Sequence, residues 1–339
     1  MPPRRRVTIR DVAAATGLSP AAVSYALRGV QTSEATQARV RRAAEELGYT
    51  GNAVARALAR GRTGLVGVLS GSLEDLSEQR FVETLGRRLG DHELHMLVVD
   101  ARGEPERERM LARQLADQLV DGLIISPLDP SDAGWADLGE ALPLVTVGDA
   151  LAGPTAGEVL FDNRAGVGMV LEHLYGMGHR RIAVLTPSRP ATPDRPAELV
   201  VAEVCEALGI EATVVNSPHS IEAATEAAAG LFARDPLPTA VFCLSDSIAC
   251  GVYAAAAARG LEIPRDVSVA GYDGHPIAAV VAPPLTTVEW GMDDVAAAAA
   301  GLLAAAVEGK PRRGARSRVR VAPVLVARGS TGVPAVVAA

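Results

Sequence analysis

Short runs of continuous apolar residues alternate with amphipathic stretches from residue 64 to near the end of this 339-residue chain. Unbroken apolar runs between helical segments are typical of parallel strands that helices cover on both faces. The runs form two sets, so the sequence predicts an α/β body of two doubly wound parallel-sheet lobes. The first set is GLVGVLS, HMLVVDA, DGLIISP and LPLVTVG, and the second is RIAVLTP, ATVVN, TAVFCLS and VSVAGYDG.

Four side chains with binding chemistry lie at the ends of these predicted strands. Asp246 follows FCLS, Asp273 follows VAGY, Arg195 lies in the loop after RIAVLTP, and Trp290 follows PPLTTV. Ligands of doubly wound sheets bind at the carboxyl ends of the strands, so these four are the candidate effector-binding residues. Carboxylates and arginines hold hydroxyl or charged groups, and an indole stacks on a flat apolar face. The structural alternatives are helix capping for Asp246, loop capping for Asp273, and core or dimer packing for Trp290.

Charge is divided sharply along the chain. Residues 1–63 hold 11 arginines and four acidic residues, a net charge of +7, while the remainder carries a net charge of −14. A basic N-terminal region on an acidic body indicates that this region alone meets a polyanion. Because it has few bulky apolar side chains, binding to a membrane surface is disfavoured.

The N-terminal segment has the signals of a helix-turn-helix. Thr8 and Asp11 form a capping pair that predicts a helix from about Ile9, and Gly17 ends that helix. Ser19 is a suitable N-cap for a second helix that begins at Pro20. A third helix is expected from about Ser33 to Leu47, with Gly48 as its cap, and the predicted inward side chains are Ile9, Val12, Ala13, Val23, Leu27, Val40, Ala44 and Leu47. We call residues 1–50, an all-α unit, the head.

Residues 51–63 follow the head as a short, helix-favouring linker. About two turns of helix are marginal in water without a packing partner. Composition leaves two interpretations open, a solvated tether and a hinge helix that folds on DNA. In the second interpretation Leu58 is an apolar wedge, and Arg56, Arg60 and Arg62 contact phosphates.

Segments along essentially the whole chain resemble the lactose-repressor (LacI-type) family of transcriptional regulators. They are, in the family's order, VTIRDVAAATGLSPAAVSYAL, RVRRAAEELGY, NAVARALARGRTGLVGVL, VDGLIISP, FDNRAGV, HLYGMGHRRIAVLTP, SDSIACGVYAAAAARGLEIPRDVSVAGYDG, PPLTTV and PVLVARGST. The resemblance implies a periplasmic-binding-protein-like body whose chain crosses between lobes near residues 160, 290 and 322. The expected domains are the head at 1–50, a hinge helix or linker at 51–63, and an effector-binding and dimerisation body at 64–339. Lobe 1 spans about 64–161 plus 291–321, and lobe 2 spans about 162–290 plus 322–339.

The resemblance also implies which residues contact DNA. Pro20, Ala21 and Tyr25 match positions that face base edges, and only Tyr25 has a hydrogen-bonding side chain, so direct readout is expected to be weak. In the hinge, Leu58 opens a central base step beside Ala55. The remaining DNA-binding positions are Thr8, Ser19, Ser24, Ser33, Thr36, Tyr49, Asn52 and Arg56, most of which match phosphate contacts that set register.

The expected protein is a cytoplasmic, homodimeric transcriptional repressor that binds a near-palindromic operator and responds to a small polar effector such as a sugar. No metal, cofactor or membrane partner is expected. An enzyme is disfavoured, because the sequence has no glycine-rich phosphate loop after a strand and no G-x-S-x-G elbow. Two alternatives remain: an effector-independent DNA-binding regulator with a degenerate cleft, and a transport-type sugar receptor, which the basic head disfavours.

Overall fold

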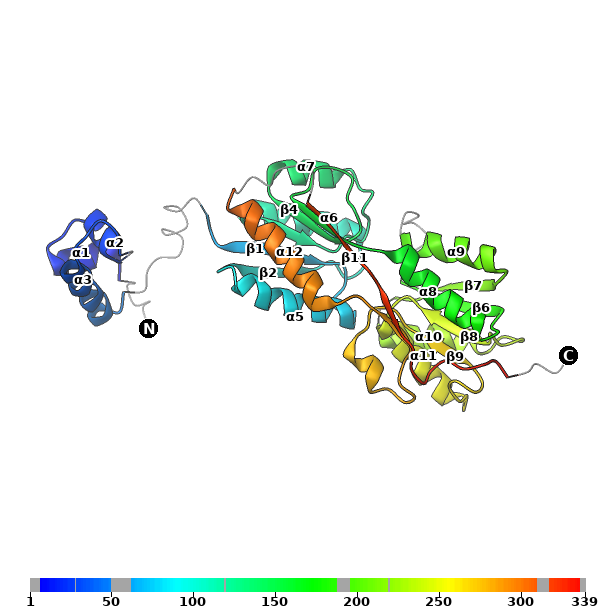
Figure 1. The fold of residues 1–339 in the computed structure, drawn as a ribbon. Helices are drawn as coiled ribbons and strands as arrows, with labels where there is room; N and C mark the ends of the chain where they lie inside the picture. Colours follow the sequence, from blue (N-terminus) through cyan, green and yellow to red (C-terminus); the bar gives the residue numbers. More distant parts are fainter. Residues whose placement is uncertain are drawn as a thin grey trace. The chain divides into compact units, whose positions relative to one another are not determined.

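The chain divides into two units, Met1–Gly64 and Leu65–Ala339. The computed structural model describes residues 7–27, 29–49, 62–118, 120–187, 196–218, 220–309 and 317–335. In the part of the chain that the structure describes, the first unit contains three helices, and the second contains parallel sheets between helices (Figure 1). The observed classes are therefore those predicted, an all-α head and an α/β body.

Local capping interactions set the bounds of the head helices α1 (Ile9–Thr16), α2 (Pro20–Leu27) and α3 (Glu34–Leu47). The Thr8 backbone N–H donates to Asp11 Oδ2 over 2.8 Å, which completes the predicted capping box. Gly17 ends α1 with a φ of 66°, and Gly48 ends α3 with the same φ. The three helices thus begin and end close to where the sequence predicts.

The head core is small and aliphatic. Leu27 is half-buried, and the fully packed side chains are Val12, Ala13, Val23, Ala26, Val40 and Ala44. The prediction that Leu47 faces inward is wrong, because 39% of its surface is exposed. The chain turns back after Gly48, the Tyr49 N–H donates to Ala44 O over 2.8 Å, and the Tyr49 ring packs against the core instead.

Lobe 1 is built on a six-stranded parallel sheet with the order β11-β5-β4-β3-β1-β2. Helices α5 (Leu76–Gly90) and α12 (Met292–Val307) cover one face, and α6 (Pro105–Asp117) and α7 (Gly134–Ala141) cover the other. The strands are β1 (Leu65–Ser70), β2 (His95–Asp100), β3 (Leu123–Ile125), β4 (Leu144–Gly148), β5 (Gly157–Phe161) and β11 (Ser317–Val321).

Lobe 2 repeats this plan with a four-stranded parallel sheet, β7-β6-β8-β9. Helices α8 (Asn163–Gly176) and α9 (Pro196–Leu208) cover one face, and α10 (Ile221–Leu231) and α11 (Asp246–Ala258) cover the other. The strands are β6 (Arg181–Thr186), β7 (Glu211–Asn216), β8 (Ala240–Cys243) and β9 (Ser268–Ala270). All eight strands predicted from apolar runs are present.

Side chains along each buried strand point to opposite faces of the sheet and pack into two different hydrophobic cores. In β1, Val66 and Val68 pack toward α5 and α12, whereas Leu69 packs toward α6 and α7. In β6, Val184 joins the core under α8 and α9, and Leu185 joins the core under α10 and α11. Both faces need apolar residues, which explains why these strands are continuous apolar runs.

The chain passes between the two sheets three times. It leaves β5 for α8, leaves β10 (Thr287–Glu289) for α12, and leaves β11 for β12 (Val324–Val326). Strands β10 and β12 pair in an antiparallel ribbon. These connections bring the carboxyl ends of strands from both sheets toward one region, where the cavity described below lies.

Among the described residues, no helix combines the length and the apolar character that crossing a bilayer would demand.

Candidate functional site

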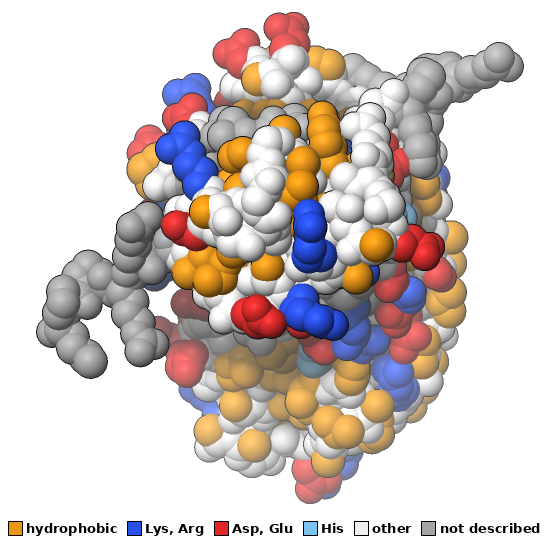
Figure 2. Space-filling view, turned by 90° about the vertical axis from the view of Figure 1, so that its left-hand side faces the viewer, with side chains coloured by type: hydrophobic (Ala, Val, Ile, Leu, Met, Phe, Trp, Pro, Cys, Tyr) orange, Lys and Arg blue, Asp and Glu red, His pale blue; other side chains and the backbone are white. Residues whose placement is uncertain are grey.

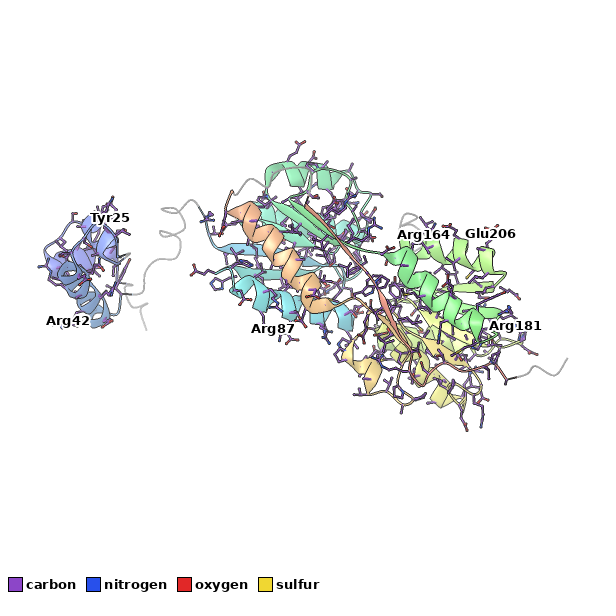
Figure 3. The ribbon with its side chains drawn as sticks, viewed as in Figure 1. Tyr25, Arg42, Arg87, Arg164, Arg181 and Glu206 are labelled. Carbon is purple, nitrogen blue, oxygen red and sulfur yellow. The ribbon has the colours of Figure 1, made fainter. Side chains whose placement is uncertain are left out.

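The start of α2 leaves the predicted base-facing residues open to solvent. Ser19 Oγ accepts a hydrogen bond from the Ala22 N–H over 3.2 Å, which caps the helix. Pro20 and Ala21 are exposed, and Tyr25 has 38% of its surface exposed. Figure 3 shows Tyr25 on α2 and Arg42 on α3 at opposite edges of the head. The exposed end of α2 is therefore free to enter a groove, as a recognition helix does.

Several predicted phosphate-contact residues also stabilise the head. The Thr8 hydroxyl donates to Asp11 Oδ2 over 2.7 Å, and Ser33 Oγ accepts from the Thr36 N–H over 3.3 Å. Ser24 is half-buried, and Tyr49 packs against the head core. Asn52, Ala55, Arg56 and Leu58 lie outside the described residues.

The head carries separate positive charges on its surface. Its exposed arginines among the described residues are Arg10, Arg39, Arg41 and Arg42. Figure 2, which faces the left-hand side of Figure 1, shows basic side chains spread over this face, some of them beside acidic ones. Exposed arginines such as these suit contacts to a phosphate backbone.

The body holds a cavity of about 180 Å³ at the carboxyl ends of strands from both lobes. Lobe 1 contributes Gly71 and Ser72 after β1, and Asp149 after β4; lobe 2 contributes Leu244 after β8 and Asp273 after β9. This is the location at which doubly wound sheets bind ligands. The rule that ligands bind at the carboxyl ends of strands, which we call the strand-end rule, therefore predicts this location from the sequence.

Three aromatic rings form one wall of the cavity. Trp290 stacks on Phe161, with ring centroids 4.8 Å apart, and meets Tyr272 edge-on at 5.4 Å. The Tyr272 hydroxyl donates to Asn163 Oδ1 over 2.9 Å, so Asn163 braces the crossing into α8. Phe161 and Trp290 lie at two of the lobe crossings, so the aromatic wall is built where the lobes join.

Four carboxylates line the cavity: Asp75, Glu78, Asp149 and Asp273. Asp75 is buried and caps α5, because its Oδ1 accepts from the Ser77 N–H over 2.6 Å. Glu78 Oε2 accepts from the Ser70 hydroxyl over 2.8 Å. Burial raises the pKa of Asp273 well above its ordinary value, and the negative charges of Asp75 and Asp246 raise this pKa further.

Asp246, predicted as a ligand contact, does not line the cavity. Its carboxylate is fully buried, where Oδ1 accepts from the Thr287 hydroxyl over 2.6 Å and Oδ2 accepts from the His275 N–H over 2.7 Å. Burial is the largest cause that raises the pKa of Asp246, to about 6. Asp246 therefore ties α11 to the loop after β9 and to strand β10, while Ser245 caps the helix.

Two hydrogen bonds join the lobes next to the cavity. The Leu76 N–H of lobe 1 donates to Ser247 Oγ of lobe 2 over 2.9 Å. The Ser245 hydroxyl donates to Asp75 Oδ2 over 3.2 Å. The N-terminus of α5 thus contacts the N-terminus of α11 directly.

Of the predicted effector residues, Asp273 and Trp290 lie at the cavity, and Arg195 lies outside the described residues. Sequence reasoning missed Asp75, Glu78 and Asp149. Asp149 directly follows β4, so the strand-end rule, applied to lobe 1 as well, would have found it. Asp75 and Glu78 lie in SLEDLSEQRF, shortly after the first predicted strand, GLVGVLS.

The described residues contain no group of three or more histidine, cysteine or acidic side chains placed to hold a metal ion. Cys205 and Cys243 are buried free thiols, and burial raises the pKa of each. These thiols therefore resemble small core residues more than reactive ones.

Comparison with known proteins identifies the family. Residues 8–52 match the bacterial regulatory proteins of the lacI family, and residues 171–331 match a periplasmic binding protein-like domain. The HTH-type transcriptional regulator reg1 of Streptomyces lividans is 32% identical over 340 residues, which cover 95% of this chain and 96% of that protein. The chain belongs to the lacI family. It is a DNA-binding transcriptional regulator and not an enzyme.

Solved structures share the fold of this lacI-family regulator. The lac repressor dimer bound to operator and the anti-inducer ONPF is 24% identical, with a TM-score of 0.84, and the match covers 97% of this chain and 100% of that one. A LacI family transcriptional regulator from Arthrobacter sp. FB24, in complex with lactose, is 26% identical with a TM-score of 0.67, covering 79% and 99%.

Proposed function

We propose that this regulator is a homodimeric repressor that binds a near-palindromic operator and is controlled by a small polar effector bound between its lobes. The observation that carries the proposal is the pairing of a helix-turn-helix with an exposed recognition helix and a body with a mixed polar and aromatic cavity at its strand ends. A regulator that binds an operator works where the DNA is, so the proposed location is the cytoplasm.

The chemistry of α2 supports a dimer. Pro20 and Ala21 offer no hydrogen bonds to bases, and Tyr25 offers a single hydroxyl, so one head distinguishes few base pairs. Two heads on one operator combine weak half-site contacts through effective concentration. The lac repressor, which shares this fold, binds its operator as a dimer.

The cavity supports a hydroxylated effector. Asp273 supplies an acceptor, and the Trp290 wall supplies a flat apolar surface. The Arthrobacter regulator is in complex with lactose, a molecule of this chemistry. Arg195, whose position is not described, stays a proposed contact on the resemblance alone.

The connection between head and cavity supports allosteric control. Strand β1 begins at Leu65, directly after the linker, and ends beside the cavity-lining Gly71 and Ser72. A change in the angle between lobes therefore moves the base of the linker. The coupling between effector and operator is typically worth about 1–3 kcal/mol.

Selection of operators from a random pool of DNA duplexes tests the DNA-binding part. We expect two inverted half-sites with a central pyrimidine–purine step, protected as one footprint. Affinity for the selected operator falls steeply with salt, because arginines displace counterions from phosphates. A selected site with a single half-site, or a flat salt response, contradicts the proposal.

Leu58→Ala tests the hinge wedge. We expect weaker binding to the selected operator, because the side chain that holds the central step open is lost. Leu199→Ala is the matched control, since Leu199 lies on α9 of the body and has 56% of its surface exposed. Equal operator affinities for the two variants exclude a wedge role for Leu58.

A regulator without an effector is the second candidate. The hydrogen bonds Leu76–Ser247 and Ser245–Asp75 favour it, because they join the two lobes through the protein's own groups. Calorimetry against sugars and nucleosides separates the two candidates. If any such compound binds and also changes operator affinity, effector control is supported. If no compound in the set does so, the second candidate is supported.

A further inference from the structure

The turn between α2 and α3 of the head contains a residue in an unusual backbone conformation. Gln31 has a φ of 54°, in the left-handed region where residues other than glycine are uncommon. Glycine adopts this angle without a steric cost. Costly conformations of this kind persist where the surrounding structure enforces them, and they are frequent at functional sites. The Gln31 side chain is therefore a candidate for a function that glycine could not perform.

The head holds this turn in place with its own hydrogen bonds. The Val30 N–H donates to Tyr25 O over 3.1 Å, which ties the turn to α2. The side-chain amide of Gln37, on α3, donates to Thr32 O over 3.1 Å, which ties the turn to α3. Gln31 lies between these two anchors. The protein itself therefore sets the position of Gln31 relative to Tyr25, the predicted base-facing residue of α2.

The side chains of Val30 and Gln31 are presented to solvent. Val30 has 46% of its surface exposed, and Gln31 is also exposed. Within the described structure the Gln31 amide makes no hydrogen bond. An exposed apolar side chain and an amide without a structural partner contribute little to the stability of the head. A costly backbone conformation that displays them indicates that they bind something outside the head.

The turn lies within reach of the groove that α2 enters. Helix α2 has eight residues and is about 12 Å long, which is close to the ~12 Å width of the major groove. When a recognition helix of this length lies in the groove, its C-terminal end also stays beside base pairs. The turn starts at that end, because Val30 is bonded to Tyr25 in the last turn of α2.

We infer that Gln31 and Val30 determine specificity by reading an A·T base pair next to the base pairs under α2. The Gln31 amide accepts from adenine N6 and donates to adenine N7, and the Val30 methyl groups contact the thymine methyl group. Guanine presents two acceptors and cytosine has no methyl group, so a G·C pair does not satisfy both side chains. This inference rests on the proposed operator binding and adds a base contact to those of α2.

Selection of operators from a random DNA pool by the full-length protein tests the inference. We expect wild type to select one A·T pair in each half-site that Gln31→Ala does not select. Gln31→Ala should bind the wild-type operator about tenfold more weakly. Gln114→Ala, on the exposed face of α6, is the matched control and should behave as wild type. If Gln31→Ala selects the wild-type site with wild-type affinity, the inference is overturned.

Modified bases at the selected pair test each contact separately. Replacing the adenine with 7-deazaadenine removes N7, which should weaken binding by wild type and not by Gln31→Ala. Replacing the thymine with uracil removes the methyl group, which should weaken binding by wild type and not by Val30→Ala. If Gln31→Ala instead loses affinity equally for all sequences, with a smaller salt dependence, Gln31 contacts a phosphate and the inference is overturned.

Gln31→Gly separates base reading from stability. Glycine relieves the cost of the positive φ, so we expect the backbone amides of the head to exchange more slowly with solvent. We also expect this variant to lose the A·T preference, as Gln31→Ala does. A glycine variant that keeps the preference would show that Gln31 only shapes the turn, and it would overturn the inference.

The same selection separates this inference from the proposed function. If wild type selects no inverted half-sites, the proposed dimeric operator is contradicted. If wild type selects inverted half-sites and both Gln31 variants keep every base preference, the proposed operator stands and only the base-reading role of Gln31 fails.

Discussion

The Ser245 hydroxyl of lobe 2 donates a hydrogen bond to Asp75 of lobe 1 over 3.2 Å, although the two residues are 170 positions apart in the chain. Asp75 also caps α5, and Ser245 also caps α11 by accepting from the Ser247 N–H over 3.1 Å. Two helix caps therefore bind each other across the lobes. This contact couples the local structure of each helix start to the closure of the body.

Replacing Ser245 with alanine tests this coupling. We expect Ser245→Ala to lower the free energy of unfolding by about 1 kcal/mol for the lost cap and by a further ~1 kcal/mol for buried Asp75, which loses a partner. Backbone amides near Leu76 should exchange faster, because the lobes separate more often. The measurements are urea denaturation and hydrogen exchange.

Ser220→Ala is the matched control, since Ser220 caps α10 by accepting from the Ala223 N–H and makes no cross-lobe bond in the described structure. Equal losses of stability in the two variants, with unchanged exchange near Leu76, would show that the Ser245–Asp75 bond contributes nothing to closure.

The aromatic wall depends on a glycine in α8. A Cβ on Gly166 would lie 2.6 Å from the Tyr272 hydroxyl oxygen and 3.1 Å from Trp290 Cη2. We expect Gly166→Ala to lower the free energy of unfolding by about 1–3 kcal/mol and to alter tryptophan fluorescence, because the rings must move. Gly168→Ala, in the same helix with no atom within 4 Å of its Cβ, should be neutral or stabilising. A Gly166→Ala protein as stable as the Gly168→Ala protein contradicts this packing.

Asp246 gives the body a specific dependence on pH. The pKa of its carboxyl group is raised from 3.8 to about 6 in the folded protein. Above pH 6 the ionised carboxylate therefore lowers the free energy of unfolding, and this destabilisation decreases as the pH falls from 6 toward 3.8. Asp246→Asn removes the cost. We expect the variant to gain about 1 kcal/mol more stability relative to wild type at pH 8 than at pH 5, measured by urea denaturation.

The comparison at two pH values must use the difference between the two proteins. Burial lowers the pKa of His173 and His179, so their titration raises the free energy of unfolding as pH rises, whereas that of Asp246 lowers it. The histidine contribution is the same in both proteins, so it cancels when their free energies of unfolding are subtracted. A difference that does not change with pH would show that Asp246 is ionised equally easily in the folded and unfolded chains.

Removal of residues 1–60 tests the predicted boundary between linker and body. We expect the remaining chain to unfold cooperatively on heating and to have no affinity for the selected operator, because the body has its own cores on both faces of two sheets. Circular dichroism and a gel-shift assay are the measurements. An unfolded product would place the boundary elsewhere.

The head was predictable because its signals act over a few residues. The capping box joins Thr8 to Asp11, Ser19 caps α2 three residues before Ala22, and Gly17 supplies its own positive φ. Leu47 shows the limit of this reasoning. Its position in the helical pattern favours burial, but only the return of the chain after Gly48 decides which side chain covers the core.

Strands β5 and β11 were not predicted, and an ion pair between a buried carboxylate and a half-exposed arginine explains why. Glu158 of β5 is fully buried, and Arg318 of β11 donates to it over 2.6 Å across paired positions of the two strands. A charged residue in the middle of a strand breaks the apolar run that marks a buried strand in sequence. The pair is acceptable only when both strands are side by side, which no single strand reveals.

The amino-acid sequence by itself determined the helices of the head, the eight apolar strands, the family resemblance and the rule that binding residues follow strand ends. These properties depend on neighbours in sequence or on simple periodicity. Only the tertiary structure decided that Asp246 turns into the protein to bind Thr287 and His275, that Asp75 meets Ser245, and that Trp290 stacks on Phe161. The partners in each case lie tens to more than a hundred residues apart, and their distances are fixed by how the sheets pack and not by any local preference of the chain.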